Sequence, residues 1–333
     1  MKKTVAIILA AASFAACIPA FTGCNCSGKV KFTLSEEGDH YIVSFAGLSS
    51  ASGEYEIPAY YGEDKLPVSE IAAEGFSGTD FSKIIVPATV TKIGNMAFSY
   101  CRSLETVEFA EGIRIESISR AMFANSEKLQ QIKIPDSVTT IDAYAFSGCN
   151  SLSDVYMGSV ESIGDAAFNG CTALEQITLP DTLITIGEMA FYLSGLKSVD
   201  IPDSVHDVVT GDGEEENTVS GLGMAAFLGC TSLESAKIGG GIKVIPSGAF
   251  GSCTSLKEVY IPLSVEEIGG AYYEKGSIVY GHAFYSCKSL TDVYFEGTED
   301  DWKSIKIEYL QYSSSVNNDA IKNAKMHYES AQD

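Results

Sequence analysis

Residues 131–149 read QIKIPDSVTTIDAYAFSGC, and the order of apolar and small residues in this stretch recurs along most of the chain. Ile132 and Ile134 alternate with a lysine, which is the pattern of a strand with one buried face. Pro135 ends that strand, because proline has no N–H to donate to a strand ladder. A valine, an isoleucine, an Ala-Phe pair and the small residue Cys149 complete the unit.

The phenylalanine of this unit marks the repeat. It returns at Phe76, Phe98, Phe123, Phe146, Phe168, Phe191, Phe227, Phe250 and Phe284, mostly at steps of 22 to 25 residues. A fixed period in the low twenties is the signature of a leucine-rich-repeat solenoid. One coil cannot bury its apolar residues alone, so each must stack on the equivalent residues of its neighbours.

The repeat pattern I-x-I-P-x-S-V-x-x-I-G-x-x-A-F-x-x-C resembles the BspA-type (Treponema pallidum-type) leucine-rich repeat of bacterial surface proteins. Two stretches match it closely, QITLPDTLITIGEMAF at 176–191 and EVYIPLSVEEIG at 258–269, and the resemblance covers roughly residues 53 to 310. It implies a mainly β repeat solenoid, a right-handed curved array with a parallel strand ladder. It also implies an N-terminal β cap and a C-terminal cap that contains the single tryptophan, Trp302.

Pattern changes along the chain divide it into five segments. We predict a lipoprotein signal peptide at 1–23, a tether at 24–30, an N-terminal β cap with a degenerate first repeat at 31–75, the solenoid at 76–297 and the C-terminal cap at 298–333. Two coils are longer than the others, which predicts inserts near 209–222 and 270–281. Both inserts leave the coil at the same point, so we expect them on one side of the solenoid.

The composition excludes several classes of partner. The chain has 44 acidic and 22 basic residues and a net charge of −22. Nucleic-acid binding requires a basic surface, so DNA and RNA are not expected partners. Adsorption on anionic lipid headgroups is disfavoured for the same reason.

The N-terminus has the features of an export signal. Two lysines precede a short apolar run, and Phe21-Thr22-Gly23-Cys24 resembles a bacterial lipobox, which makes Cys24 the predicted lipid-modified residue. A second, weaker candidate ends at Cys17, and an ordinary signal peptide or an uncleaved anchor are alternatives. We therefore expect a chain exported and lipid-anchored at the bacterial cell envelope, exposed at the surface, with the anchor as its contact with the membrane.

The cysteines beyond the leader occupy one position of the repeat. Each lies three residues after a repeat phenylalanine, at Cys101, Cys149, Cys171, Cys230, Cys253 and Cys287. Other copies have Thr79, Ser126 and Ser194 at that position, so we expect small buried side chains that bond to a backbone carbonyl of their own turn. Free thiols follow from this pattern, since side chains in a ladder run parallel; disulfides or a metal are the alternatives.

Tyrosines are the least ordinary surface feature. Tyr260 and Tyr294 fall on outward strand positions, Tyr272, Tyr273 and Tyr280 lie in the second insert, and the first insert carries Glu214, Glu215 and Glu216. Tyrosine suits contacts with proteins or sugars, although it is also common on ordinary sheet faces. These eight residues form the predicted ligand-binding site in the C-terminal half. An ordinary solvated acidic loop is the simpler interpretation of the glutamates, and calcium is the alternative.

The sequence thus predicts a binding protein and no enzyme. No nucleophile–base pair or paired acids stand out, the four histidines have no metal-ligand spacing, and neither a cofactor nor a metal is expected. Resemblance to the family implies adhesion, with a protein or glycan on a host or neighbouring cell as the partner. Glycan or nutrient capture and a structural spacer are the alternatives, and the chain is expected to be a monomer.

Overall fold

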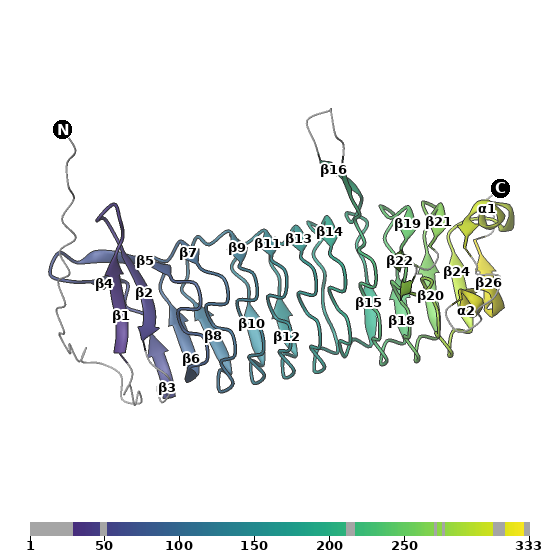
Figure 1. Cartoon of the computed structure of the whole chain (residues 1–333). Coiled ribbons are helices and arrows are strands. Elements are labelled where there is room, and N and C mark those ends of the chain that lie inside the picture. The colour runs from purple at the N-terminus through teal and green to yellow at the C-terminus, as the bar shows by residue number, and fades with distance from the viewer. Residues whose placement is uncertain are drawn as a thin grey trace.

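The computed structural model describes residues 29–46, 52–210, 217–269, 272–274, 277–308 and 317–329. The chain forms one row of stacked coils that runs from the N-terminal to the C-terminal end (Figure 1). A longer strand and a strand of two residues alternate along the chain in most coils, and each pairs in parallel with its equivalent in a neighbouring coil. The predicted solenoid and its parallel ladder are confirmed.

The longer strands form two five-stranded sheets, one in each half of the row. The first comprises β3 (Ser52–Glu56), β6 (Asp80–Val86), β8 (Thr106–Phe109), β10 (Gln131–Lys133) and β12 (Asp154–Tyr156). The second comprises β15 (Ser198–Asp200), β18 (Ser235–Lys237), β20 (Glu258–Ile261), β24 (Asp292–Phe295) and β26 (Lys325–Tyr328). We call the outward-facing side chains of these two sheets the strand face.

The short strands form a second ladder, which the sequence did not predict. Its first part comprises β9 (Ser117–Ile118), β11 (Thr140–Ile141), β13 (Ser162–Ile163) and β14 (Thr185–Ile186). Its second part comprises β19 (Val244–Ile245), β21 (Glu267–Ile268) and β25 (Lys306–Ile307). Each strand except β25 ends in an isoleucine that is buried or nearly so. Two residues are too short for the alternation that identifies a strand in a sequence.

One predicted strand is wrong. Residues 176–178 form no strand, and this break separates the two sheets of longer strands. The coils on either side differ in length: Val155 to Phe168 is one residue shorter than Ile132 to Phe146, and the turn after Phe191 is also shorter by one. Differences of this size occur elsewhere without breaking the ladder, since Ile84 pairs with Val107 although the turn after Phe76 is one residue shorter than the turn after Phe98.

The repeat phenylalanines form a continuous buried spine. All nine are fully buried, and successive ring centroids lie 5.2 to 5.8 Å apart. From Phe98 onward neighbouring rings are within 12° of parallel. Burying an aromatic ring is among the largest apolar contributions a residue makes. The spine crosses the break at residues 176–178, so the core is continuous where the sheet is not.

The six cysteines of the repeat are buried free thiols, as predicted. Their predicted hydrogen-bond partner was wrong for all six, because each donates its shortest bond to the preceding coil. The Cys171 Sγ donates to the carbonyl of Phe146 at 3.3 Å, which lies in the preceding coil and not in its own turn. That carbonyl also accepts the backbone N–H of Cys149 at 3.1 Å, using its second lone pair.

The same bond to a preceding phenylalanine recurs along the column. Phe76, Phe123, Phe191, Phe227 and Phe250 accept from Cys101, Cys149, Cys230, Cys253 and Cys287 at 3.0 to 3.2 Å. The cysteine prediction therefore fails at every one of these positions, and Ser126 likewise bonds to Phe98. Thr79 bonds to Phe76 of its own turn, because it belongs to the first copy of the unit.

The serine of the P-x-S-V motif also joins adjacent coils. The Oγ of Ser137 donates to the Ile115 carbonyl at 2.7 Å, and the Oγ of Ser204 and Ser264 donate to Leu183 and Ile242. Hydroxyl and thiol donors thus both point toward the preceding coil, and each such bond joins two adjacent coils. This explains why a small residue with a donor recurs at both positions.

The N-terminal segment contains the predicted hairpin. β1 (Lys29–Leu34) and β2 (Tyr41–Ala46) pair antiparallel, and β5 (Leu66–Ile71) continues their sheet with β4 (Tyr60–Tyr61) and β7 (Lys92–Ile93). This sheet leads into the row of short strands. β3 begins the row of longer strands, one coil earlier than the sequence predicted.

The C-terminal segment closes the other end with two short helices, α1 (Glu299–Ser304) and α2 (Asp319–Asn323). Thr298 is the N-cap of α1 and forms a capping box with Asp301, which confirms the predicted cap. Trp302 packs edge-on against Phe295, at 5.3 Å between ring centroids. β26 then adds one more strand beyond the last predicted coil.

Both inserts contain antiparallel hairpins. The first pairs β16 (Val208–Thr210) with β17 (Asn217–Val219), and the second pairs β22 (Tyr272–Glu274) with β23 (Ser277–Tyr280). Figure 1 shows the first hairpin standing away from the row of coils, whereas β22 lies within the outline of the row. The two hairpins therefore do not project in one common direction, which corrects the expectation that both lie on one side.

Candidate functional site

The strand face is built by register. In each pair of longer strands, outward residues lie beside outward residues, so side chains form columns across the coils. The central column of the first sheet is Glu56, Ile85, Glu108, Lys133 and Tyr156, and that of the second is Asp200, Lys237, Tyr260, Tyr294 and His327. A parallel sheet fixes these side chains at regular spacing, so the face is organised before any partner binds.

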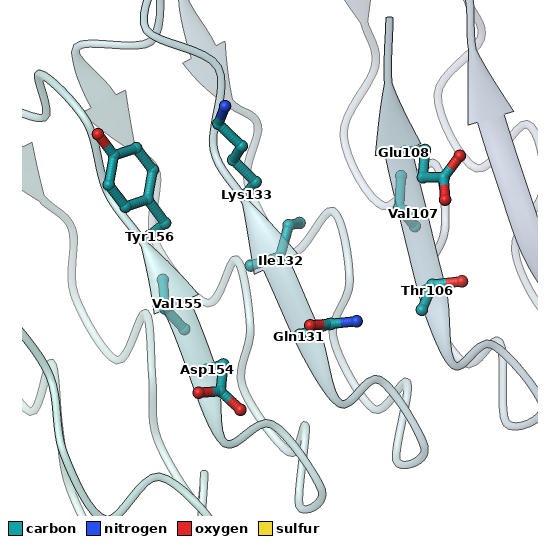
Figure 2. Close-up of a pocket in the computed structure, with 9 residues that line it drawn as sticks. All are labelled: Thr106, Val107, Glu108, Gln131, Ile132, Lys133, Asp154, Val155 and Tyr156. Carbon is teal, nitrogen blue, oxygen red and sulfur yellow. The ribbon is translucent and has the colours of Figure 1, made fainter.

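The first sheet has a shallow depression of about 410 Å³ over β8, β10 and β12. Figure 2 shows its outward residues: Thr106 and Glu108, Gln131 and Lys133, and Asp154 and Tyr156. Val107, Ile132 and Val155 form its floor. We call these nine residues the β8–β12 depression.

Charges of both signs alternate in the β8–β12 depression. The Lys133 ammonium lies 5.8 Å from the centre of the Tyr156 ring, within cation–π range. Next to it, Lys83 pairs with Glu108 at 2.7 Å, and this hydrogen bond raises the pKa of the lysine. Tyr156 is 58% exposed, although it belongs to a sheet. The depression thus offers donors, acceptors and an exposed aromatic ring together.

Tyr156 lies on β12, the last strand of the first sheet. The next coil passes this point without forming a strand, at residues 176–178. Sequence reasoning placed Tyr156 and Lys133 on the strand face but did not select them. The end of the sheet at β12 gave no signal in the sequence, since residues 176–178 keep the alternation of the other strands.

The predicted tyrosines of the second sheet form a stack. The ring centroids of Tyr260 and Tyr294 are 4.6 Å apart, and those of Tyr294 and His327 are 4.4 Å apart. We call these three residues the Tyr–His stack. His327 also contacts Asp292 at 2.7 Å, and this hydrogen bond lowers the pKa of that carboxyl group. The rings of the stack cover one another's faces, so the faces of Tyr294 are not available to a flat ligand.

The structure brings together only part of the predicted ligand-binding site. Tyr260 and Tyr294 are adjacent and half-buried. Tyr272, Tyr273 and Tyr280 lie in β22 and β23, and the structure describes only the backbone of these strands. Glu214, Glu215 and Glu216 lie outside the described residues, as does the predicted lipidation site at Cys24.

In the described part of the chain, no group of His, Cys, Asp and Glu side chains is arranged to hold a metal ion. Among the same residues, no helix has the length and apolar character needed to cross a membrane. His282 is buried, while His40 and His327 each pair with an aspartate.

Solved structures with the same fold come from bacteria. A leucine rich cell surface protein from Faecalibacterium prausnitzii A2-165 is 23% identical, with a TM-score of 0.54, and the match covers 86% of this chain and 98% of that chain. A leucine-rich repeat protein from Bacteroides ovatus ATCC 8483 is 19% identical, with a TM-score of 0.54 and coverage of 90% and 98%. The pneumococcal vaccine antigen PcpA is 19% identical, with a TM-score of 0.51 and coverage of 91% and 92%.

These likenesses concern the fold. Among curated proteins, no sequence matches this chain. At the level of sequence families, residues 69–159, 158–210 and 214–280 match the family described as the BspA type leucine rich repeat region. The matched segments span more than half of the chain and contain the phenylalanine spine from Phe76 to Phe250. The chain belongs to the BspA type leucine rich repeat family.

Proposed function

We propose that this protein is a non-catalytic binding protein of the bacterial cell surface, and that its strand face binds a protein partner. The observation that carries the proposal is the β8–β12 depression, where an exposed tyrosine and charges of both signs are held on a rigid sheet. Preorganised side chains lose little conformational entropy on binding. Tyrosine in particular contributes a large contact area with only two rotatable side-chain bonds.

Family and fold support a role at the cell surface. The F. prausnitzii protein with this fold is described as a cell surface protein, and the pneumococcal one as a vaccine antigen. We extend this location to the present chain, with export by the N-terminal signal and a lipid anchor at Cys24. Adhesion to a protein on a host or neighbouring cell is the role that fits such a location.

The central test compares two regions of the strand face. Protein lacking residues 1–26 is immobilised and exposed to surface proteins of candidate host and bacterial cells, and the captured partner is identified and titrated. Lys133→Ala/Tyr156→Ala is then compared with Tyr260→Ala/Tyr294→Ala, because both pairs lie on central outward positions. We expect the first pair to weaken binding at least about tenfold, as is typical for residues that anchor an interface.

The insert variants complete the comparison. Tyr272→Ala/Tyr273→Ala and a deletion of residues 211–217 test the site predicted from the sequence. If these or the Tyr–His stack variants abolish binding while Lys133→Ala/Tyr156→Ala does not, the site lies in the C-terminal half. If none of the variants changes the affinity, the strand face is not the binding surface.

Glycan binding is the second candidate function. Tyr156 favours it, since its side chain is exposed. The Lys133 ammonium lies 5.8 Å from the ring centre, and among the described residues no aromatic ring stacks on it. Sugars stack on such a face while polar side chains bind their hydroxyl groups. A glycan array separates the two functions: glycan hits that are lost in Tyr156→Ala but kept in Tyr156→Phe support sugar stacking, whereas a protein captured in its place supports adhesion.

A further inference from the structure

The row of longer strands ends in an edge strand at each end of the solenoid. β3 is the terminal strand of the first sheet and β26 is the terminal strand of the second. Both belong to the same row and lie at its opposite ends (Figure 1). Within the described residues no strand pairs with the outer edge of either one, and such edges are templates for pairing with another chain.

The backbone groups at the two edges are complementary. In intact pairs of this row, residues with outward side chains bond to the preceding coil, as when the Lys325 N–H donates to the Thr291 carbonyl at 2.7 Å. Residues with inward side chains bond to the following coil, as when the Ile57 N–H donates to the Ile85 carbonyl at 3.0 Å. Backbone groups of Met326 therefore point outward at the C-terminal end, away from β24.

At the N-terminal end, the residues with outward side chains are the ones whose backbone groups face the free edge. By the same alternation, the N–H and C=O groups of Glu54 and Glu56 face away from β6. If β3 of a second molecule lay parallel to β26, Met326 would donate to the carbonyl of Glu54 and accept from the N–H of Glu56. This is the hydrogen-bond pattern that already joins adjacent strands within each of the two sheets of the row.

Side chains on the two edges also match. In this register Lys325 lies opposite Glu54 and His327 opposite Glu56, while Met326 meets Tyr55 on the inner face. Glu54, Glu56 and Lys325 are exposed. Lysine–glutamate pairs between adjacent coils already recur within the chain, at Lys83–Glu108, Lys92–Glu70, Lys197–Glu175, Lys243–Glu266 and Lys257–Glu234.

We propose that the occupant of each edge is a second copy of this chain, joined head to tail through β26 of one molecule and β3 of the next. Such a junction is heterologous, so its repetition yields linear chains rather than closed dimers. Pairing of two N-terminal ends is disfavoured because it opposes Glu54 and Glu56 to the same carboxylates. The junction would lengthen the strand face. It is inferred independently of the function proposed for that face.

Overall charge opposes the association. Each molecule has a net charge of −22, and this repulsion acts over longer distances than the contacts of one junction. At 0.15 M ionic strength the screening length is about 8 Å, so most of the repulsion is screened while contact pairs are less affected. We therefore expect weak association that increases from low to physiological salt. The association should be measured at physiological ionic strength.

Sedimentation velocity over a concentration series tests the junction, with protein lacking residues 1–26. The wild-type protein is expected to form species that grow with concentration. Glu54→Lys/Glu56→Lys blocks only the N-terminal edge, and Lys325→Glu/His327→Glu blocks only the C-terminal edge, so each variant alone is expected to remain monomeric. In an equimolar mixture one junction is wild type and the other places the introduced lysines opposite the introduced glutamates, so association that grows with concentration is expected to return.

Met326→Pro provides a variant that does not alter charge. Its N–H faces outward, so proline removes a donor at the junction and no bond within the chain. We expect a dissociation constant at least about tenfold weaker. Because Met326 also packs against the core, Met326→Ala is the control for the loss of its side chain. Tyr156→Ala, far from both edges, is the control and is expected to associate normally.

Two results would overturn the proposal. One is a wild-type protein that stays monomeric at all concentrations and salt conditions. The other is association that survives both edge variants and Met326→Pro, since the interface then lies elsewhere on the molecule. Circular dichroism of each variant establishes that loss of association does not come from loss of the fold.

Discussion

The side-chain oxygen of Asn318 accepts a hydrogen bond from the backbone N–H of Phe284 at 3.0 Å. In the preceding coil the same N–H, that of Phe250, donates to the carbonyl of Ala283 in the next coil at 2.9 Å. Asn318 therefore takes the position that a backbone carbonyl of the next coil takes for Phe250. Its amide nitrogen donates to the carbonyls of Gly269 and Glu308, at 3.3 and 3.1 Å, so one fully buried side chain completes the last turn.

Asn318→Ala is expected to destabilise the C-terminal end. The substitution leaves the Phe284 N–H buried without a partner, and an unsatisfied buried group costs about 1 to 3 kcal/mol. Chemical denaturation measures the free energy of unfolding, and Asn150→Ala, at an exposed asparagine in the middle of the row, is the matched control. Equal loss in both variants would mean that the Asn318 bonds do not stabilise the end of the solenoid.

Phe168→Ala is expected to lower the free energy of unfolding by about 3 to 5 kcal/mol, because it opens a cavity in the spine. Phe168 is fully buried and lies 5.2 Å from the rings of both neighbours. Tyr156→Ala removes a ring of similar size from the exposed face, so it serves as the control. A Phe168→Ala protein as stable as the control would place the phenylalanine column outside the core.

The six repeat cysteines are expected to resist alkylation in the folded protein and to react when it unfolds. They are buried, and burial raises the pKa of thiols such as Cys101. The reactive form is the thiolate, which such burial disfavours. Mass spectrometry before and after unfolding, without reduction, measures the label on each residue. Peptides that join Cys149 to Cys171 would contradict the free-thiol column.

Alkaline pH is expected to destabilise the fold through these thiols. Burial raises the pKa of Cys149 from 9.0 to about 12 and that of Cys230 to about 11. The unfolded chain then releases protons that the folded chain retains, so the stability present below pH 9 declines as pH rises toward those values. Each thiol contributes a slope of about 1.4 kcal/mol per pH unit.

A matched variant tests the decline of stability at alkaline pH. Cys149→Ser keeps a small donor at a position where Ser126 already occurs in another copy, but it removes one ionisable thiol. Denaturation at pH 7 to 10.5 is expected to show a shallower decline for Cys149→Ser than for the wild type. Identical slopes would show that this thiol does not ionise differently in the two states.

The mature chain is expected to begin at a lipid-modified Cys24. Cells grown with labelled palmitate are expected to incorporate the label into the wild-type protein and not into Cys24→Ala. Cys26→Ala is the control, since that cysteine lies two residues further on. Label that persists in Cys24→Ala would move the site to Cys17 or Cys26, and a wild-type protein without label would exclude a lipid anchor.

Features that repeat were accessible from the sequence. The phenylalanine spine, the parallel ladder, the free thiols and the Thr298 cap each follow from residue types at fixed spacing. Features that depend on exceptions to the repeat were not. The break at residues 176–178 interrupts a segment that keeps the alternation of a strand, and Asn318 bonds to Phe284 at a position that no repeated residue type marks.

The candidate site shows the same division. Outward positions such as Lys133 and Tyr156 could be assigned from strand alternation, but the depression that they line depends on where the sheet stops. Stacking of Tyr260 on Tyr294 was likewise implicit in their shared column. That it covers the ring faces, and so removes them from contact with a flat ligand, required the side-chain geometry.

The thiol and hydroxyl bonds between coils have a consequence for how such chains evolve. Each coil carries the donors that dock it on the preceding coil, and it offers the following coil the same phenylalanine carbonyl that it uses itself. A coil copied by tandem duplication of its coding sequence therefore arrives with a ready-made fit on both sides. Gain or loss of whole repeats can lengthen or shorten the protein in steps without any compensating substitution.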